Sequence, residues 1–206
     1  MKVFYWNIRG LANKLSRDTL FNFCKQFNPD IVCISEPMMN PVDFPNSFLR
    51  ATNMNLGVFN SRDGISKIWL FISSHIPHYD VVSNSEQEIT LSFMVSAVLH
   101  HISFIYASVQ LYRRRKLWDV LGHLSFGNAP WLVIGDFNVI LGAHEKTGGR
   151  LPDPRSCDDF ATMISDCNLF DIPSSGAQFT WARKSGTRYV ECRLDRALCN
   201  SHWFEE

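Results

Sequence analysis

The chain has 206 residues, of which 46% are hydrophobic and 19% charged, so it can bury a substantial core and is not disordered. We predict a single domain over residues 1–206, because a chain of this length can bury most of its surface in one core. The 20 Lys and Arg residues balance the 20 Asp and Glu residues. A polyanion would therefore have to be held by a local basic patch, and the net charge neither supports nor excludes nucleic acid as a partner.

The six cysteines form no CxxC pair, and no histidine lies at a zinc-finger spacing from them. Polar residues interrupt the opening segment before an apolar run of secretory length develops. We therefore predict an intracellular protein with no disulfide partner, whose thiols are core residues. Residues 89–112 carry no charge, but serine and histidine interrupt them. Two buried strands joined at His100–His101 explain this stretch better than a membrane span.

The first forty residues predict a strand, a helix and a second strand. Residues 2–6 are β-branched and aromatic and predict a strand that ends at Asn7. A helical stripe of apolar residues follows, with Asn13 placed to cap it. Residues 31–35 predict a buried strand that ends at Glu36. If the two strands are parallel neighbours, the side chains at their ends are neighbours too.

The middle of the chain predicts a loop followed by antiparallel strands. Residues 37–55 contain several prolines and asparagines and are expected to be a long loop. The strand-like runs beyond them follow one another too closely for helices to intervene. These runs cover residues 56–60, 67–72, 78–83, 88–99 and 102–109.

The second half predicts two more helices around a buried strand. Apolar residues from Leu117 to Leu124 recur at helical spacing. The buried strand 131–135 then ends in Asp136 and Asn138. Ser156, with an acid three residues later, resembles a capping box for the next helix. The last predicted strands cover residues 178–182 and 191–198.

These elements predict an α/β fold. Alternating βα units around an antiparallel middle suggest two mostly antiparallel, packed sheets flanked by helices, which is a four-layer sandwich. Neither GxGxxG nor GxxxxGKS occurs in the chain. A nucleotide-binding loop of either type is therefore not expected.

Small polar or acidic side chains follow four of the predicted strands. They are Asn7, Glu36, the pair Asp136 and Asn138, and Asp195. Mg²⁺ is typically held by one or two carboxylates with water and substrate phosphate, and an asparagine amide can orient a carboxylate or donate to phosphate oxygen. Each residue alone is explained by the preference of Asp and Asn for turns. Together they indicate phosphoester hydrolysis.

Short motifs carry a family resemblance over nearly the whole chain. They are WNIRG at 6–10, SEP at 35–37, IYAS at 105–108, IGDFN at 134–138, FTW at 179–181 and RLDRAL at 193–198. In order and spacing they resemble the endonuclease/exonuclease/phosphatase family, which includes DNase I and the abasic-site endonucleases. The chain is most similar to the endonuclease domain of plant LINE-type non-LTR retrotransposons, with HEKTGGR at 144–150 expected to be a loop.

The resemblance implies a DNase I-like fold and a metal-dependent site. Glu36 matches the principal ligand of Mg²⁺ or Mn²⁺, and Asn7 contacts the network around the metal. Asp136 matches the acid that positions or deprotonates the attacking water. Asn138 matches the amide that orients the scissile phosphate.

The resemblance extends to the remaining site residues. Tyr106 matches the tyrosine whose hydroxyl supports the phosphate in the transition state. Asp195 matches the carboxylate that holds a catalytic histidine in its tautomer. Thr180 corresponds to a position that meets DNA in the retrotransposon members.

A basic cluster opens the second predicted helix and consists of Arg113, Arg114, Arg115 and Lys116. Cations at a helix start oppose the macrodipole, which favours a role in binding phosphates. A solvated helix end is the alternative.

The resemblance implies a product and partners. The product is a nicked DNA strand with a 3′ hydroxyl, and a reverse transcriptase domain accompanies the endonuclease in a full-length relative. Nuclear residence follows only from the DNA substrate.

One departure from the family pattern concerns the end of the chain. Family members carry a Ser-Asp-His element and usually a last core strand there, whereas the 206 residues contain no such triplet. We therefore expect a C-terminally truncated domain that cleaves DNA weakly or not at all. Two alternatives stay open: a phosphatase or phosphodiesterase acting on inositol, lipid or RNA, and a catalytically inactive DNA-binding remnant.

Overall fold

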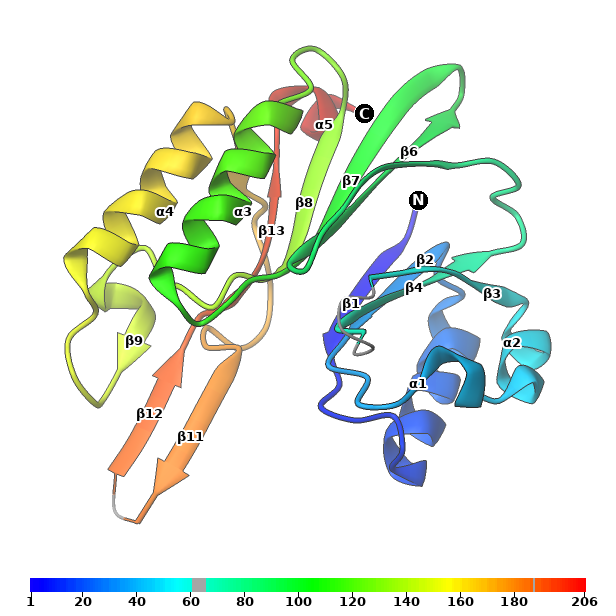
Figure 1. The fold of residues 1–206 in the computed structure, drawn as a ribbon, viewed down its shortest axis with the longest axis horizontal. Coiled ribbons are helices and arrows are strands. Elements are labelled where there is room, and N and C mark those ends of the chain that lie inside the picture. Colours follow the sequence, from blue (N-terminus) through cyan, green and yellow to red (C-terminus); the bar gives the residue numbers. More distant parts are fainter. Residues whose placement is uncertain (61–65, 187) are drawn as a thin grey trace. The chain divides into compact units, whose positions relative to one another are not determined.

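A computed structural model describes residues 1–60, 66–186 and 188–206. The chain divides into two compact units, Met1–Met94 and Val95–Glu206. Figure 1 shows a mixed α/β architecture whose sheets are flanked by helices, which confirms the predicted fold class. In the described part of the chain no helix has the length and apolar character needed to cross a bilayer.

The first unit is built on a four-stranded sheet in the order β1-β2-β4-β3. β1 and β2 are parallel neighbours, which is the condition for their polar ends to meet, and the two pairs formed by β4 are antiparallel. The core of this unit contains four buried aromatic residues, namely Phe44, Phe48 of α2, Trp69 and Phe71. In chain order the elements are β1 (Val3–Asn7), α1 (Lys14–Phe27), β2 (Ile31–Ser35), the 3-10 turn η1 (Pro41–Asp43), α2 (Asn46–Thr52), β3 (Met54–Phe59), β4 (Ile68–Ser73), β5 (Asp80–Asn84) and β6 (Glu88–Val95).

Helix α1 forms where its capping residue predicts. Asn13 Oδ1 accepts a hydrogen bond from the Leu15 amide at 2.9 Å, which satisfies one of the unpaired donors at the helix start. Leu20 and Cys24 face the core. Asn28 ends the helix in the left-handed conformation at φ 45°.

Residues 37–55 are not the long loop that we predicted. Pro41 is the first residue of η1, and Pro45 immediately precedes α2. Proline is favoured at these positions because a helix start has no intrahelical partner for its amide hydrogen. Phe48 of α2 contacts Phe44 edge-to-face at 5.1 Å between ring centroids. The prolines therefore mark helix starts here and not a structureless loop.

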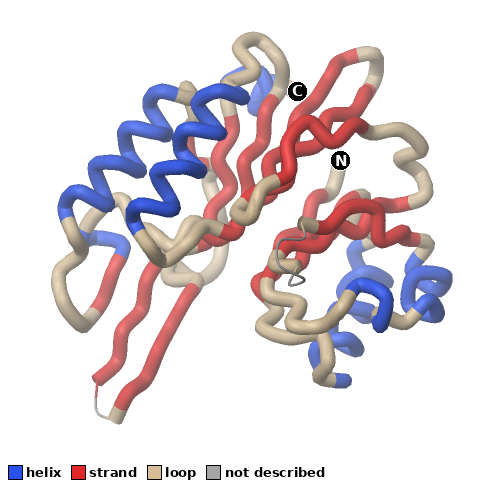
Figure 2. The backbone as a smooth tube through the Cα atoms, viewed as in Figure 1, coloured by secondary structure: helices blue, strands red, loops and turns tan. Residues whose placement is uncertain are grey.

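The second unit is built on strands in the order β10-β13-β8-β7. β7 and β8 are parallel, and β13 pairs with β8 antiparallel. Helices α3 and α4 lie side by side on one face of this sheet (Figure 2). Its elements are β7 (Val98–Tyr106), α3 (Leu111–Leu124), β8 (Trp131–Asp136), the 3-10 turn η2 (Ala143–Glu145), β9 (Lys146–Thr147), α4 (Pro154–Asp166), β10 (Phe170–Asp171), β11 (Trp181–Ser185), β12 (Arg188–Cys192), β13 (Asp195–Cys199) and α5 (Ser201–Glu205).

The turn after β6 lies at Ser96 and Ala97, so our prediction of a turn at His100–His101 is wrong. Ser96 and Ala97 take positive φ values of 49° and 67°, which a tight two-residue turn requires. Both histidines are buried within β7. His101 stacks on Phe126 at 3.5 Å between ring centroids, and burial lowers its pKa.

Helix α4 begins three residues earlier than the predicted capping box would place it. Asp153 is the N-cap, and its side chain accepts from the Arg155 amide at 3.1 Å. Pro154 follows at the first helical position, where it is favoured. Ser156 lies inside the first turn, and its hydroxyl accepts from Arg114 Nη2 at 2.5 Å.

The chain end forms three strands where we predicted two. β11 and β12 are paired antiparallel, and β9 adds to the outer side of β12. The break before β13 falls at Arg193 and Leu194, whose amides donate outside the hairpin ladder, to Glu145 O and Thr180 Oγ1. The ladder therefore ends at this point, and β13 joins β8 in the larger sheet.

The segment HEKTGGR, expected to be a loop, forms η2, β9 and a close backbone contact. A Cβ atom on Gly148 would lie 2.1 Å from the Tyr189 carbonyl oxygen. Gly148 also has a φ of +73°, which favours glycine. The two glycines let this segment approach β12 more closely than any side chain permits.

The six cysteines are buried and free. Burial raises their pKa values, that of Cys24 to about 11 and that of Cys33 well above its ordinary value. Because the thiolate is the reactive form, we expect native protein to react slowly with a thiol reagent at about pH 8. All six should react quickly in denaturant. Rapid labelling of several thiols in the native protein would contradict this.

Candidate active site

The first unit brings Asn7 and Glu36 together. Asn7 ends β1 and is aligned with Ser35 of the parallel strand β2, so Glu36 follows at the same edge. Asn7 Nδ2 donates a hydrogen bond to Glu36 Oε1 at 3.0 Å. The amide therefore fixes one oxygen of a partly exposed carboxylate.

The backbone at Glu36 is in a conformation that L residues rarely adopt. Its φ is +52°, which costs on the order of 1–3 kcal/mol for a residue other than glycine. The Glu36 amide donates to Lys67 O at 3.0 Å, and its carbonyl accepts from Gly10 N at 2.9 Å. Neighbouring segments thus hold the strained residue, and such strain tends to concentrate at functional sites.

This donor set fits a hard divalent cation. Mg²⁺ uses one or two carboxylates and retains several waters, so it does not require a cage of protein ligands. Among the described residues no three His, Cys, Asp or Glu side chains form such a cage. Glu36, oriented by Asn7, would be the protein ligand in the first unit.

The second unit places three predicted site residues side by side. Asp136 of β8 is aligned with Tyr106 of β7 and with Asp195 of β13. Aligned residues on neighbouring strands share a face. Trp131 and Val133 belong to the core under α3 and α4, so by strand alternation Asp136 faces the opposite way. Tyr106, Asp136 and Asp195 therefore line the face without helices.

Asp136 and Asp195 are directly opposite each other in an antiparallel pair. Like charges in this position destabilise a sheet. Asp136 is only 5% exposed, which strengthens the effect. An arrangement that opposes stability in this way is typical of a functional site.

The turn after β8 fixes Asn138. Asp136 Oδ1 accepts from the Asn138 amide at 2.9 Å, and Asn138 Nδ2 donates to Ala107 O at 2.8 Å. Asn138 has a φ of +48°, which asparagine tolerates better than most residues. The sequence Asp-Phe-Asn thus forms a rigid turn that ties the ends of β7 and β8 together.

Thr180 supports the backbone that leads to Asp195. Its hydroxyl accepts hydrogen bonds from the amides of Leu194 and Asp195, both at 3.0 Å. The side chain itself lies in an exposed position. Thr180 therefore has a structural role besides the one that the resemblance implies.

The predicted basic cluster divides into buried and exposed members. Arg114 is 4% exposed and donates to Ser108 O at 2.9 Å, and burial lowers its pKa. Arg115 pairs with Asp159 of α4 at 2.7 Å. These two arginines attach α3 to its surroundings, although the Arg115 side chain is exposed, as those of Arg113 and Lys116 are.

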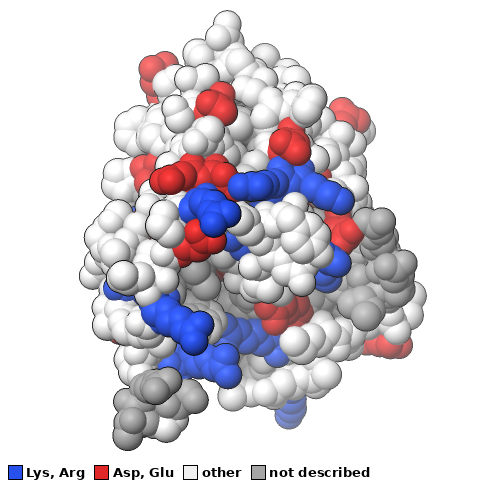
Figure 3. Space-filling model, turned by 60° about the vertical axis from the view of Figure 1, so that its left-hand side comes forward, with Lys and Arg blue, Asp and Glu red and all other residues white. Residues whose placement is uncertain are grey.

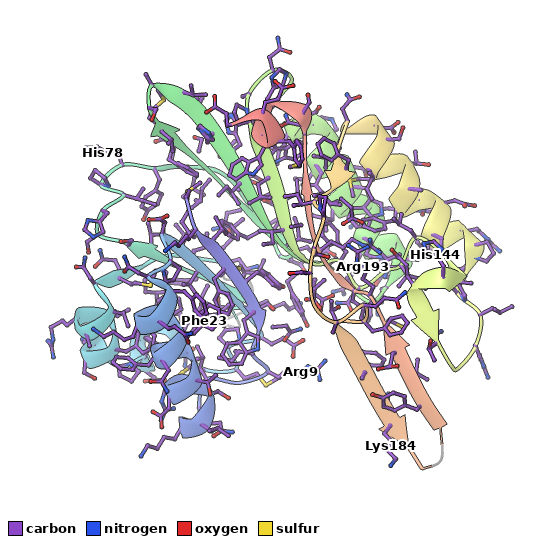
Figure 4. The ribbon with its side chains drawn as sticks, turned by 180° about the vertical axis from the view of Figure 1, so that it is seen from behind. Arg9, Phe23, His78, His144, Lys184 and Arg193 are labelled. Atoms are coloured by element: carbon purple, nitrogen blue, oxygen red, sulfur yellow. The ribbon has the colours of Figure 1, made fainter. Side chains whose placement is uncertain are left out.

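Other exposed basic residues lie on β11 and were missed in the sequence. Arg183 and Lys184 are exposed, and Figure 4 shows Lys184 near the end of the hairpin and Arg193 at its base. The Ser-Gly pair at 185–186 is a turn signal, and it would have predicted the hairpin that carries these basic residues. On the face that Figure 3 shows, both acidic and basic side chains reach the surface.

The sheets, their helices and the polar strand ends define a DNase I-like α/β protein. Comparison with family profiles then identifies the family. The chain belongs to the Endonuclease/Exonuclease/phosphatase family, whose profile matches residues 4–206. This confirms the resemblance carried by the sequence motifs. A comparison with curated protein sequences finds no match.

Solved structures share the fold at low sequence identity. The endonuclease domain of TRAS1, a telomere-specific non-LTR retrotransposon, superposes with a TM-score of 0.72 and 15% identity, covering 99% of this chain and 87% of that one. The AP endonuclease LMAP from Leishmania major gives 0.71 and 14%, covering 97% and 79%. The 3′ phosphatase NExo from Neisseria, bound to a product DNA hairpin, gives 0.69 and 16%, covering 98% and 87%.

Proposed function

We propose that the chain is a Mg²⁺- or Mn²⁺-dependent phosphodiesterase that nicks DNA, an endonuclease of retrotransposon origin. The observation that carries this proposal is the alignment of the acids Asp136 and Asp195 directly opposite each other, with Tyr106 beside them on the neighbouring strand. The opposed acids favour a hydrolase over a binding module, because a surface that only binds DNA has no need of them.

Each residue has a defined task in this proposal. Glu36 holds the cation and Asn7 orients its carboxylate. A bound Mg²⁺ supplies charge neutralisation at the scissile phosphate. Asp136 orients the attacking water and accepts its proton, and Asn138 positions the phosphate.

The remaining residues support the phosphate and its surroundings. The Tyr106 hydroxyl donates to the phosphate as negative charge develops on it. Asp195 lies directly opposite Asp136 and matches the carboxylate that orients a histidine in family members. No covalent intermediate is required, since water attacks phosphorus directly.

We propose that both units serve one reaction, so that residues 1–206 act as a single domain. The family profile spans both units, and each unit contributes residues that match family positions. Exposed Arg113, Lys116, Arg183 and Lys184 are suited to phosphate contacts, alongside Thr180. The similarity to TRAS1 supports DNA as substrate and a reverse transcriptase as partner in a longer relative, which would place the reaction in the nucleus.

The decisive experiment is nicking of supercoiled plasmid with protein in excess. We expect slow nicking that requires Mg²⁺ and stops in EDTA, because the 206 residues contain no Ser-Asp-His triplet. Replacement Glu36→Gln should lower the rate by about 10²-fold or more, since a neutral amide holds Mg²⁺ poorly. Glu205→Gln, the same change at an exposed position of α5, should leave the rate unchanged.

Other outcomes separate the alternatives. Cleavage of inositol phosphates, a lipid or RNA in preference to plasmid would support a phosphatase or phosphodiesterase of the same fold. DNA binding in a gel shift without turnover at any Mg²⁺ concentration would identify an inactive remnant. Fast nicking would contradict the expected impairment.

A further inference from the structure

Four charged side chains form a closed ring at the base of the β11–β12 hairpin. The charge ring consists of Glu145, Asp171, Arg193 and Arg196, and each arginine contacts both acids. Arg196 donates to Asp171 at 2.7 Å and pairs closely with Glu145. Arg193 lies 3.1 Å from Asp171 and 3.6 Å from Glu145. The formal charges cancel within the ring.

The charge ring is largely buried. The Arg196 side chain is fully buried at 0% exposure, and that of Glu145 is 6% exposed. Glu145 also accepts from the Leu141 amide at 2.7 Å. The Arg196 guanidinium lies over the Phe160 ring of α4 at 5.5 Å. Side chains from η2, β10, β13 and the short segment before β13 thus meet at one point.

The two arginines flank Asp195 in the sequence. Arg196 and Asp195 are neighbours in β13 and point to opposite faces of the sheet. The Arg193 amide donates to Glu145 O at 3.0 Å, and the amides of Leu194 and Asp195 donate to Thr180. The backbone that carries Asp195 is therefore held at every residue from 193 to 196.

Stability alone is a poor explanation of the charge ring. Removing charges from water is costly, and buried ion pairs can often be replaced by apolar residues without loss of stability. An ionic ring does fix geometry, because each guanidinium fits its carboxylates in few orientations. Asp195 lies directly opposite Asp136, so the place of its carboxylate depends on how firmly the backbone of β13 is held.

We propose that the charge ring is a positioning device that holds Asp195 for phosphodiester cleavage, and that Glu145 is its central positioning residue. The inference rests on the proposed function, since it assigns Asp195 to the reaction. The proposal makes Glu145 important for turnover, although Glu145 belongs to the turn η2 and not to a strand that carries a site residue.

The test compares Glu145→Gln with Leu121→Ala. Leu121 is fully buried in the core of the same unit, and its truncation removes stability without touching the charge ring. Asp171→Asn opens the ring at its more exposed side and serves where Glu145→Gln does not fold. Each variant is measured at a temperature where thermal unfolding shows it to be fully folded.

Two readouts are taken. We expect Glu145→Gln or Asp171→Asn to lower kcat for plasmid nicking by about 10–100-fold with KM little changed, as for other residues that orient a site group. Glu145→Asp should recover part of this loss. Hydrogen exchange at the amides of Leu194 and Asp195 should quicken by about tenfold more in the ring variants than in Leu121→Ala.

The proposal is overturned if Leu121→Ala lowers kcat as much as the ring variants do, or if the two amides exchange equally in all variants. If the wild-type chain nicks no DNA, the proposed function fails and the exchange measurement alone decides. Faster hydrogen exchange at the two amides in the ring variants alone then supports the positioning role of the charge ring, and equal exchange in all variants overturns that role.

Discussion

Replacement Asp136→Asn is expected to lower DNA nicking by about 10²–10⁴-fold while leaving stability equal or higher. The amide cannot accept a proton from water, so the chemical step slows. It keeps the oxygen that accepts from the Asn138 amide at 2.9 Å, and it removes the like-charge repulsion with Asp195. The measurements are single-turnover nicking and the Tm of thermal unfolding.

Asp119→Asn is the matched control. Asp119 lies exposed on α3, and the same chemical change there should alter neither nicking nor Tm. A fall in the Tm of Asp136→Asn would show that the carboxylate is stabilising, which would contradict its assignment to catalysis at the expense of stability.

Replacement Gly135→Ala is expected to destabilise the protein by about 3 kcal/mol or more. A Cβ atom at this position would lie 2.0 Å from the Ile105 carbonyl oxygen. Rigid backbone of the neighbouring strand β7 cannot move aside as a flexible side chain can. The φ of +153° adds conformational strain for alanine. Denaturant unfolding measures the loss.

The same substitution at Gly122 is expected to have the opposite effect on stability. Gly122 lies in α3, and a Cβ atom there meets nothing within 4 Å. Alanine in an exposed helix position stabilises by about 1 kcal/mol relative to glycine. If Gly135→Ala is also neutral or stabilising, β7 and β8 cannot be packed as closely as the structure shows.

The sequence predicts best those elements whose buried residues form one apolar run or recur at helical spacing. β2 was predicted with its full bounds because all five of its residues are buried and apolar or small, and α1 because Asn13 caps a clear apolar stripe. The contact between Asn7 and Glu36 also followed, since two parallel strands ending together leave few other arrangements.

Local sequence patterns do not indicate contacts between segments that are far apart in the chain. Glu145 and Arg196 lie 51 residues apart, and nothing in their local sequence indicates a pair. The start of α4 was misplaced because Ser156 has the right spacing for a cap, whereas Asp153 before Pro154 is the stronger start signal. The basic cluster reads as one surface, yet Arg114 and Arg115 bind to α4 and its first turn.

The close approach of Gly148 to β12 means that this glycine of the HEKTGGR motif is not by itself evidence of catalytic activity in a related protein. A Cβ atom on Gly148 would overlap the Tyr189 carbonyl. This requirement arises from fitting one stretch of chain against another and not from handling a phosphate. A homologue that had lost its hydrolytic chemistry would therefore still need a glycine at this position.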